Sequence, residues 1–476
     1  MKVFTNAAWL SVSRSSTDVL SFVLFTVIAR TFGPAGTGEY SYAFAIGMLL
    51  ALFASSGLEE FGIRQYARAT AGDRPRLWAD LLSMQCVQVG VGAVVFGLLA
   101  VVGIFHPVRW VVALEISVYL AGWMIARTLF VPAMACQSMM TPALTDLGCR
   151  LLAIVSAIAL AVFGKAPLPW MLAGFPVGGI ALVCLAARNA RRHGAALRLS
   201  SSSTRMAATA RQVAPFAGVD LLGQFYARTD LLLIAYFLGN AQVGLYATDI
   251  KFIEVGLLPL FMLGSAAYPL LSRHAAHDTK AFESCGRDFV RFVFFCTGWL
   301  VVGIYCLVPL LLVPLFGEKF IAAAVLVPGI ALLALVKGIE TALYRVLYAA
   351  RRQLIYLIGL STGTALIVAL NTLLIPSFGL KGAVLAAVLS TASVDVFCVA
   401  GLARPLAPAF LPAMLCRLVL AIATTASLIA AVTRAGLGPW LTAVVGCVGF
   451  PVVGVVFGLV PDPRRSHLFR PTDLVF

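Results

Sequence analysis

RTFGPAGTGEY, residues 30–40, has a counterpart later in the chain in YFLGNAQVGLY, residues 236–246. Both stretches contain Gly-x4-Gly-x-Tyr at the end of a hydrophobic segment. One offset of 206 residues relates three pairs of positions: Gly33 and Gly239, Gly38 and Gly244, Tyr40 and Tyr246. The hydrophobic segments around these positions repeat at about the same offset. The sequence therefore predicts an internal repeat of membrane-spanning helices.

The composition is that of a polytopic membrane protein. Of the 476 residues, 61% are hydrophobic and 12% are charged, against about 25% charged residues in an ordinary soluble domain. A spanning helix needs about 20 apolar residues, so the chain has room for about fourteen. No cleavable signal peptide is expected, because the first apolar segment contains Arg14 and Asp18. The ten cysteines are scattered singly, so we expect neither a metal site nor a disulfide framework.

Hydropathy and the Pro and Gly positions predict an all-α protein with about fourteen transmembrane helices. The predicted spans are residues 8–30, 40–63, 81–105, 109–134, 141–163, 169–187, 213–238, 243–270, 289–315, 321–349, 354–376, 380–402, 409–432 and 438–460.

The Lys and Arg residues between the spans predict the orientation. Connectors after even-numbered spans, together with the termini, hold twenty of them, and connectors after odd-numbered spans, together with the span ends that adjoin them, hold six. The six are Arg30, Arg109, Lys165, Lys319, Lys381 and Arg434. By the positive-inside rule both termini are cytoplasmic. The net charge of +15 thus reflects topology and attraction to an anionic leaflet, and it does not indicate nucleic-acid binding.

The repeat predicts two lobes of six helices each, and the charges inside the predicted spans indicate a central cavity between them. The N-lobe covers residues 1–187 and the C-lobe covers residues 213–402. Residues 188–212, which are basic and include four consecutive serines, are predicted to be a cytoplasmic linker. Two further helices and a cytoplasmic tail occupy residues 403–476.

Ionisable residues inside predicted spans point to the function, because a charge at membrane depth faces a partner, a water-filled cavity or a substrate. They concentrate on spans 1, 4, 7, 8 and 10. The candidates for a polar cavity are Arg14, Asp18, Arg127, Asp220, Arg228, Lys251, Lys337, Glu340 and Arg345. For each of them a purely structural ion pair is the alternative, as for Arg14 and Asp18, one turn apart on one helix face. Glu59, Glu60 and Arg64 are interpreted as an interfacial anchor or gate contact.

The sequence favours a transporter over an enzyme. It has no G-x4-G-K-[ST] loop and hence no P-loop ATPase of its own. No outward loop exceeds about ten residues, which leaves no extramembrane surface for a glycosyltransferase or polymerase site. A structural scaffold would not need so many charges inside its spans.

Several motifs resemble bacterial polysaccharide-transporter proteins, the lipid-linked oligosaccharide flippases of the multidrug/oligosaccharidyl-lipid/polysaccharide exporter superfamily. They are Asn6…Trp9-Leu10, Ile28 to Ser41, Gly57-Leu58…Arg64, Asp230 to Tyr246 and Phe378 to Ala383. The resemblance extends to about residue 402. It implies alternating access between two six-helix bundles, with a cationic cavity for the lipid pyrophosphate and sugar. Arg14 matches the arginine that the family carries in its first span.

The resemblance also implies energy from an ion gradient, Na⁺ or H⁺, without a cofactor. Some relatives hold sodium with residues of spans 7, 11 and 12, which makes Asp230, Asn371, Thr391 and Asp395 the candidate cation site. The expected substrate is a polyprenyl-diphosphate-linked oligosaccharide in the bacterial inner membrane. Membrane lipids are expected partners, and a polysaccharide polymerase and chain-length proteins are candidate ones. Translocation of lipid II for peptidoglycan and drug/cation antiport remain alternatives; neighbouring genes would separate the first of these from repeat-unit export.

Overall fold

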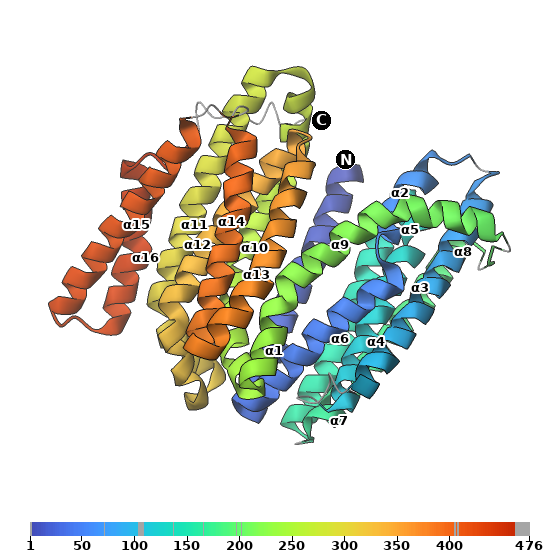
Figure 1. The fold of residues 1–476 in the computed structure, drawn as a ribbon, viewed down its shortest axis with the longest axis horizontal. Helices are drawn as coiled ribbons and strands as arrows, with labels where there is room; N and C mark the ends of the chain where they lie inside the picture. Colours follow the sequence, from blue (N-terminus) through green and yellow to red (C-terminus); the bar gives the residue numbers. More distant parts are fainter. Residues whose placement is uncertain are drawn as a thin grey trace. The chain divides into compact units, whose positions relative to one another are not determined.

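The computed structural model describes residues 2–461 except 71, 103–108, 137, 165, 197, 201, 404–405 and 407–408. For residues 2–15, 102, 203, 215–216 and 276–277 it describes the backbone alone. Every regular element in the described part of the chain is helical (Figure 1). The elements are α1 (Lys2–Ser55), α2 (Leu58–Arg68), α3 (Arg74–Val102), α4 (Trp110–Leu129), α5 (Val131–Ala135), α6 (Met140–Val162), α7 (Leu168–Leu172), α8 (Gly174–Arg192), α9 (Ser203–Leu238), α10 (Asn240–His277), α11 (Thr279–Phe316), η1 (Glu318–Leu326), α12 (Val327–Ala349), α13 (Gln353–Phe378), α14 (Leu380–Leu402), α15 (Phe410–Arg434) and α16 (Pro439–Val456).

All fourteen predicted spans contain helix, and residues 103–105 of the third span lie outside the described part of the chain. The spans predicted at 40–63, 109–134, 169–187 and 321–349 are each divided between two consecutive helices. Twelve helical segments of the described chain are long and apolar enough to cross a membrane. One of them holds two predicted spans, because α1 has 54 residues and is kinked at Gly33; at 1.5 Å per residue it would be about 80 Å long, far more than one crossing requires. The predicted span 213–238 lies within α9. The all-α polytopic fold class is therefore confirmed, and the chain is a multi-pass membrane protein.

The chain divides into two compact units, Met1–Gly244 and Leu245–Phe476. In the first unit, α4 and α6 each pack against both α1 and α8. In the same unit, α9 contacts α1, α2 and α3. In the second unit α12 packs against α11 and α14, and α13 packs against α14. The final pair, α15 and α16, lies side by side and contacts α11 (Figure 1). The lobe boundaries inferred from the sequence, at residues 187 and 213, stay a prediction.

Helix occupies both ends of the basic connector expected at residues 188–212. The preceding helix, α8, continues to Arg192, and α9 begins at Ser203, ten residues earlier than the predicted span. The Ser202 hydroxyl accepts a hydrogen bond from the backbone N–H of Arg205, which satisfies one of the free donors at the start of α9. The connector is held to α3 by a hydrogen bond from the backbone N–H of Ser200 to Ser83 Oγ (2.6 Å) and by an ion pair between Arg205 and Asp80 (3.6 Å).

Four helix junctions share one unusual backbone conformation. Gly33 (φ 67°, ψ −167°) and Gly239 (φ 81°, ψ 174°), which the repeat equates, adopt it in α1 and between α9 and α10. Gly317 (φ 98°, ψ 167°) and Gly379 (φ 58°, ψ −138°) adopt similar angles before η1 and before α14. Only glycine enters this region readily, because a Cβ would clash with the backbone. The structural reason for the first glycine of the repeated motif is thus the sharp change of chain direction between two helices.

Candidate functional site

The two copies of the repeated motif contact each other within the first unit. A Cβ at Gly38 would overlap the backbone carbonyl oxygen of Asn240, and a Cβ at Gly244 would overlap that of Pro34. Pro34 and Asn240 are themselves equivalent at the offset of 206 residues. The contact is therefore reciprocal, each second glycine of the motif packing on the residue that follows the first glycine of the other copy. We call this arrangement, formed by Pro34, Gly38, Asn240 and Gly244, the glycine contact.

A cluster of charges joins α2, α4 and α9. The guanidinium of Arg127 forms ion pairs with Glu59 and, at 3.6 Å, with Glu60. Asp220 accepts a hydrogen bond from the backbone N–H of Gly57 (3.1 Å) and interacts electrostatically with Glu60 and Arg127. Glu59 and Glu60 lie in the first turn of α2, where the helix dipole favours negative charge. We call Glu59, Glu60, Arg127 and Asp220 the Arg127 cluster.

We expect the Arg127 cluster to contribute to the free energy of unfolding of the first unit. Breaking a buried ion pair by removing one partner costs about 3–5 kcal/mol. Arg127 is 34% exposed and Glu59 is 14% exposed, so solvent screens part of this energy and we expect Arg127→Gln to destabilise the first unit by about 2 kcal/mol. Thermal unfolding of the purified protein in detergent measures the effect.

The matched control for that variant is a double-mutant cycle. Glu59→Gln removes the closest carboxylate partner of Arg127, so the double variant should be destabilised clearly less than the sum of the two single variants. Additive losses would show that Arg127 and Glu59 contribute independently, and the cluster would then not act as a unit.

Arg150 is a charged residue that the sequence analysis missed. It lies on α6, forms an ion pair with Asp146 (3.3 Å) and interacts electrostatically with Asp18 of α1. Two guanidinium groups lie over the ring of Trp123, that of Arg150 at 4.9 Å and that of Arg127 at 5.2 Å from the ring centroid. Cations favour the negative face of an indole ring. The spacing of Asp146 and Arg150, one helical turn apart in the predicted span 141–163, was the available signal.

The structure describes the side chains of some, but not all, of the cavity residues predicted in spans 1 and 7. Asp18 is half-buried, and the structure places it near Arg150. Arg14 belongs to the helical backbone of α1, but its side chain is outside the described part of the structure, so its predicted pairing with Asp18 stays a prediction. Arg228 lies over the ring of Phe44, 5.5 Å from its centroid, which joins α9 to α1.

The second unit contains a separate polar cluster on α12, α13 and α14. The hydroxyl of Tyr356 donates a hydrogen bond to Glu340 (2.9 Å), and Lys337 interacts electrostatically with the same carboxylate. Asp395 interacts electrostatically with both Glu340 and Lys337. The structure thus brings Asp395, which we had assigned to the candidate cation site, together with two residues assigned to the substrate cavity.

Aromatic rings extend this second cluster. Tyr344, Tyr348 and Tyr356 form a triangle with centroids 5.4–5.9 Å apart. The guanidinium of Arg345 lies 4.9 Å from the Tyr344 ring. Lys251, by contrast, forms an ion pair with Glu254 of its own helix (2.6 Å).

The candidate cation ligands are buried to different degrees. Asn371 is fully buried, Thr391 is 2% exposed, and neither polar atom of the Asn371 amide has a hydrogen-bond partner among the described residues. Asp230 belongs to the first unit, where its carboxylate accepts a hydrogen bond from the backbone N–H of Leu231 (2.8 Å). Asp249 on α10, which was not among the predicted ligands, is a fully buried carboxylate with no hydrogen bond to either oxygen in the described part of the chain. Within that part no three His, Cys, Asp or Glu side chains gather as a metal site would require.

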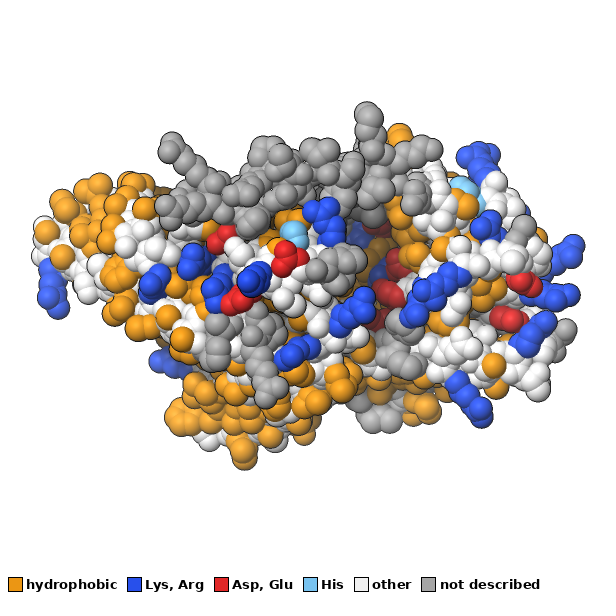
Figure 2. Space-filling model, turned by 90° about the horizontal axis from the view of Figure 1, so that it is seen from above, with side chains coloured by type: hydrophobic (Ala, Val, Ile, Leu, Met, Phe, Trp, Pro, Cys, Tyr) orange, Lys and Arg blue, Asp and Glu red, His pale blue; other side chains and the backbone are white. Residues whose placement is uncertain are grey.

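Cations gather at one end of the first unit. Figure 2 views this end, where basic side chains, all of them arginines, lie over the end of α2, the start of α3, the end of α8 and the start of α9. Exposed arginines at these helix ends are Arg64, Arg68, Arg76, Arg188, Arg191, Arg192, Arg205 and Arg211. At the opposite end of the unit Arg109 pairs with Glu39 (3.4 Å). The gathered cations lie in the connectors that the sequence predicts to be cytoplasmic.

Comparison with known proteins identifies one matching family. The family model described as polysaccharide biosynthesis protein matches residues 3–275. No curated protein gives a significant match.

Solved structures share the fold of most of the chain. The lipid II flippase MurJ in its inward closed conformation has a TM-score of 0.71 at 12% identity, covering 94% of this chain and 97% of MurJ. An inward-facing multidrug resistance transporter of the MATE family, in the MOP superfamily, has a TM-score of 0.65 at 13% identity, covering 82% of this chain and 94% of that one. The MATE multidrug transporter DinF-BH has a TM-score of 0.57 at 16% identity, covering 85% of this chain and 95% of that one. At these identities the likeness establishes the fold alone.

Proposed function

Because this chain belongs to the polysaccharide biosynthesis protein family, whose model spans more than half of its length, we propose that it is a flippase for a lipid-linked oligosaccharide. The substrate is an undecaprenyl-diphosphate-linked repeat unit, which moves from the cytoplasmic to the periplasmic leaflet of the inner membrane. The proteins that share the family and the fold are transporters and flippases rather than enzymes. The proposal rests on one observation: a chain of this family has several cations inside its membrane-spanning helices.

The chemistry of the substrate accounts for these cations. A pyrophosphate cannot enter hydrocarbon without compensating charge, and arginine binds phosphate oxygens through two parallel hydrogen bonds. Arg127 already pairs with Glu59 and Glu60, so an arriving phosphate would replace carboxylates rather than water around the guanidinium. The polyprenyl tail needs no such site, since it stays in the lipid.

The glycine contact supports alternating access. By the predicted orientation it lies at the periplasmic end, where the equivalent turns of the two halves would meet when that side is closed. Glycine at positions 38 and 244 lets two backbones touch, and the contact has to open to release substrate outward. The cycle would draw on a gradient of Na⁺ or H⁺, with Asp230, Asn371, Thr391 and Asp395 as the candidate ligands. Imposing each gradient separately on proteoliposomes distinguishes the two ions.

Arg14 is the residue on which the test of this function depends. If its guanidinium binds the pyrophosphate, Arg14→Ala should abolish export of the repeat unit at normal abundance of the protein in the membrane. Arg14→Lys should retain part of the activity, because it keeps the charge and loses the two-pronged hydrogen bonding. Export of the repeat unit and membrane abundance are measured in the same cells. Loss of export that merely follows loss of the protein would assign Arg14 to a structural pair with Asp18 instead.

Lipid II translocation is the second candidate, and the fold match to MurJ over 94% of this chain favours it. The two functions differ in the sugar attached to a common lipid diphosphate. Expression in cells depleted of their own lipid II flippase separates them: a repeat-unit flippase leaves those cells unable to grow, whereas a lipid II flippase restores growth. Drug/cation antiport is disfavoured, because such antiporters prefer an acidic cavity and this chain places several cations in its spans.

A further inference from the structure

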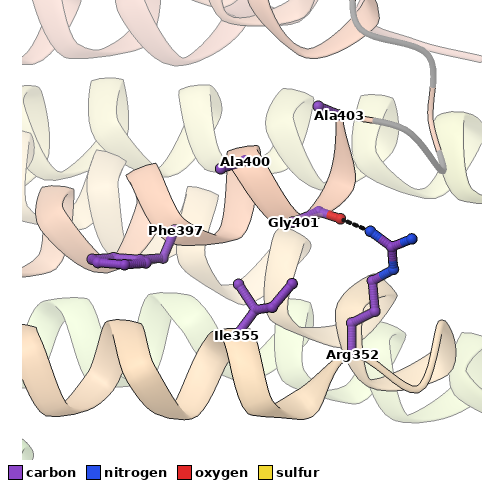
Figure 3. Close-up of a pocket in the computed structure, with 6 residues that line it drawn as sticks. All are labelled: Arg352, Ile355, Phe397, Ala400, Gly401 and Ala403. Carbon is purple, nitrogen blue, oxygen red and sulfur yellow. Dashed lines mark hydrogen bonds between the residues drawn. The ribbon is translucent and has the colours of Figure 1, made fainter.

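The second unit has a pocket at the predicted cytoplasmic end of α13 and α14 that is separate from its polar cluster. It has a volume of about 400 Å³ and is lined by Arg352, Ile355, Phe397, Ala400, Gly401 and Ala403 (Figure 3). Its walls are apolar apart from one guanidinium. The volume falls in the range of small-molecule sites, about 300–1,000 Å³.

Arg352 is held at this pocket in a fixed orientation. One terminal nitrogen of its guanidinium donates a hydrogen bond to the backbone carbonyl of Gly401 (2.9 Å), near the end of α14, where helix carbonyls carry partial negative charge. Figure 3 shows the other two nitrogens directed away from that carbonyl. They are the donors that an anion at the pocket mouth would meet.

Arg351, the neighbouring residue, is placed by a strained turn. It has φ 58° and is the one non-glycine residue with positive φ in the described part of the chain. The backbone N–H of Arg352 donates to the carbonyl of Leu347 (2.9 Å), which closes a Schellman turn at the end of α12. Glycine is the usual residue at such a position, and another residue there costs about 1 kcal/mol or more. The turn thus places a second, exposed arginine directly before Arg352 in the chain.

The surroundings of the pocket indicate what kind of anion fits. On α13, Leu354 is 66% exposed and Ile358 is 48% exposed, and on α14 Val396 is 68% exposed. In a membrane protein such side chains face acyl chains. A lipid whose acyl chain lies against these side chains has its phosphate at the level of the helix ends, whereas a water-soluble anion would make no contact with them.

We propose that this pocket binds an anionic diacyl phospholipid of the cytoplasmic leaflet. The phosphate contacts Arg352 and Arg351, and an acyl chain lies against Ile355, Phe397 and Ala400. Basic pockets between transmembrane helices on the cytoplasmic side suit anionic headgroups, and each cation near the surface contributes about 1 kcal/mol. The bound lipid would tie α13 to α14 on the membrane-facing side. The inference does not depend on which substrate the protein transports.

The test is native mass spectrometry of the delipidated full-length protein with added phosphatidylglycerol or phosphatidylcholine. The wild type should retain phosphatidylglycerol. Arg352→Gln keeps a donor for Gly401 and loses the charge, so it should raise the Kd for phosphatidylglycerol about fivefold, as about 1 kcal/mol predicts. Ala400→Phe fills the pocket from an exposed position and should reduce binding without touching Arg352. Arg434→Gln, at the exposed end of α15, is the matched control and should bind like the wild type.

Several results would overturn the proposal. Equal retention of the two phospholipids would remove the role of the headgroup charge, and wild-type binding in both Arg352→Gln and Ala400→Phe would place the lipid elsewhere. Displacement of the lipid by millimolar inorganic phosphate would identify a free-phosphate site. Displacement by undecaprenyl diphosphate at equal concentration would assign the pocket to the transported lipid.

Discussion

Alanine at Gly38 should reduce export at least tenfold while the protein remains in the membrane at normal abundance. The added Cβ would overlap the backbone carbonyl oxygen of Asn240 and lie within 2.9 Å of the backbone nitrogen of Gly244. Neither atom belongs to a flexible side chain, so the two turns must separate to make room. Alanine is a better helix former than glycine, and Gly38 lies within α1, so the substitution itself favours the helix. The loss would therefore come from the glycine contact and not from unfolding.

Two controls accompany the Gly38 variant. Gly244→Ala inserts a methyl group from the opposite side, toward Pro34, and should cause the same loss of export. Gly218→Ala in α9 and Gly90→Ala in α3 place a Cβ in open space and should leave export unchanged. Export is measured as polymer formed from the transported repeat unit, with membrane abundance determined in parallel. Normal export by Gly38→Ala would show that the glycine contact is not part of the transport cycle.

The sequence predicted the helices well because a membrane imposes a length on each of them. About 20 apolar residues between polar connectors leave few alternatives, and all fourteen predicted spans contain helix. The ends of helices were harder to predict, because polar residues continue a helix beyond the hydrocarbon. The start of α9 at Ser203 is one example. A hydrogen bond and an ion pair to α3 hold this basic, serine-rich segment, and a hydropathy profile does not reveal such contacts.

The repeated motif indicated the turn at its first glycine, but it did not indicate that the two copies contact each other. Gly33 and Gly239 share an offset and a backbone conformation, and both features follow from the requirement for glycine at a sharp junction. Gly317 and Gly379 have similar angles, but no Gly-x4-Gly-x-Tyr pattern surrounds them. The second glycine, Gly38 or Gly244, is required by its contact with the backbone of the other copy, and that contact cannot be inferred from the sequence.

The sequence alone could not predict which charged residues contact one another. Helical periodicity places residues on one face of one helix, as it did for Lys337 and Glu340. It does not say which helix packs on that face, and so Arg127 was assigned to a cavity while its partners Glu59 and Glu60 were assigned to an interfacial anchor. Asp395 was likewise grouped with cation ligands, although α14 packs on α12 beside Glu340. These partners depend on the order of helices in space.

Cysteines at Ala35 and Ala241 should crosslink and stop transport completely, and a reductant should restore it. The two alanines are equivalent at the offset of 206 residues, and each follows a residue of the glycine contact. Both are exposed, so neither substitution should disturb packing. The background is a variant without the ten native cysteines, all of which are free. Oxidation would hold the two turns together, whereas the proposed alternating access needs them to part at the side that we predict to be periplasmic.

The crosslinking experiment has matched controls at the same two positions. A single cysteine at either position cannot form the intramolecular bridge, so oxidant should leave export by the two single variants unchanged. Gly38→Ala in the double-cysteine background should lower the crosslinked fraction, because the methyl group forces the turns apart. Efficient crosslinking with undiminished export would mean that the two turns stay together throughout the cycle, and the periplasmic opening would then have to form elsewhere in the protein.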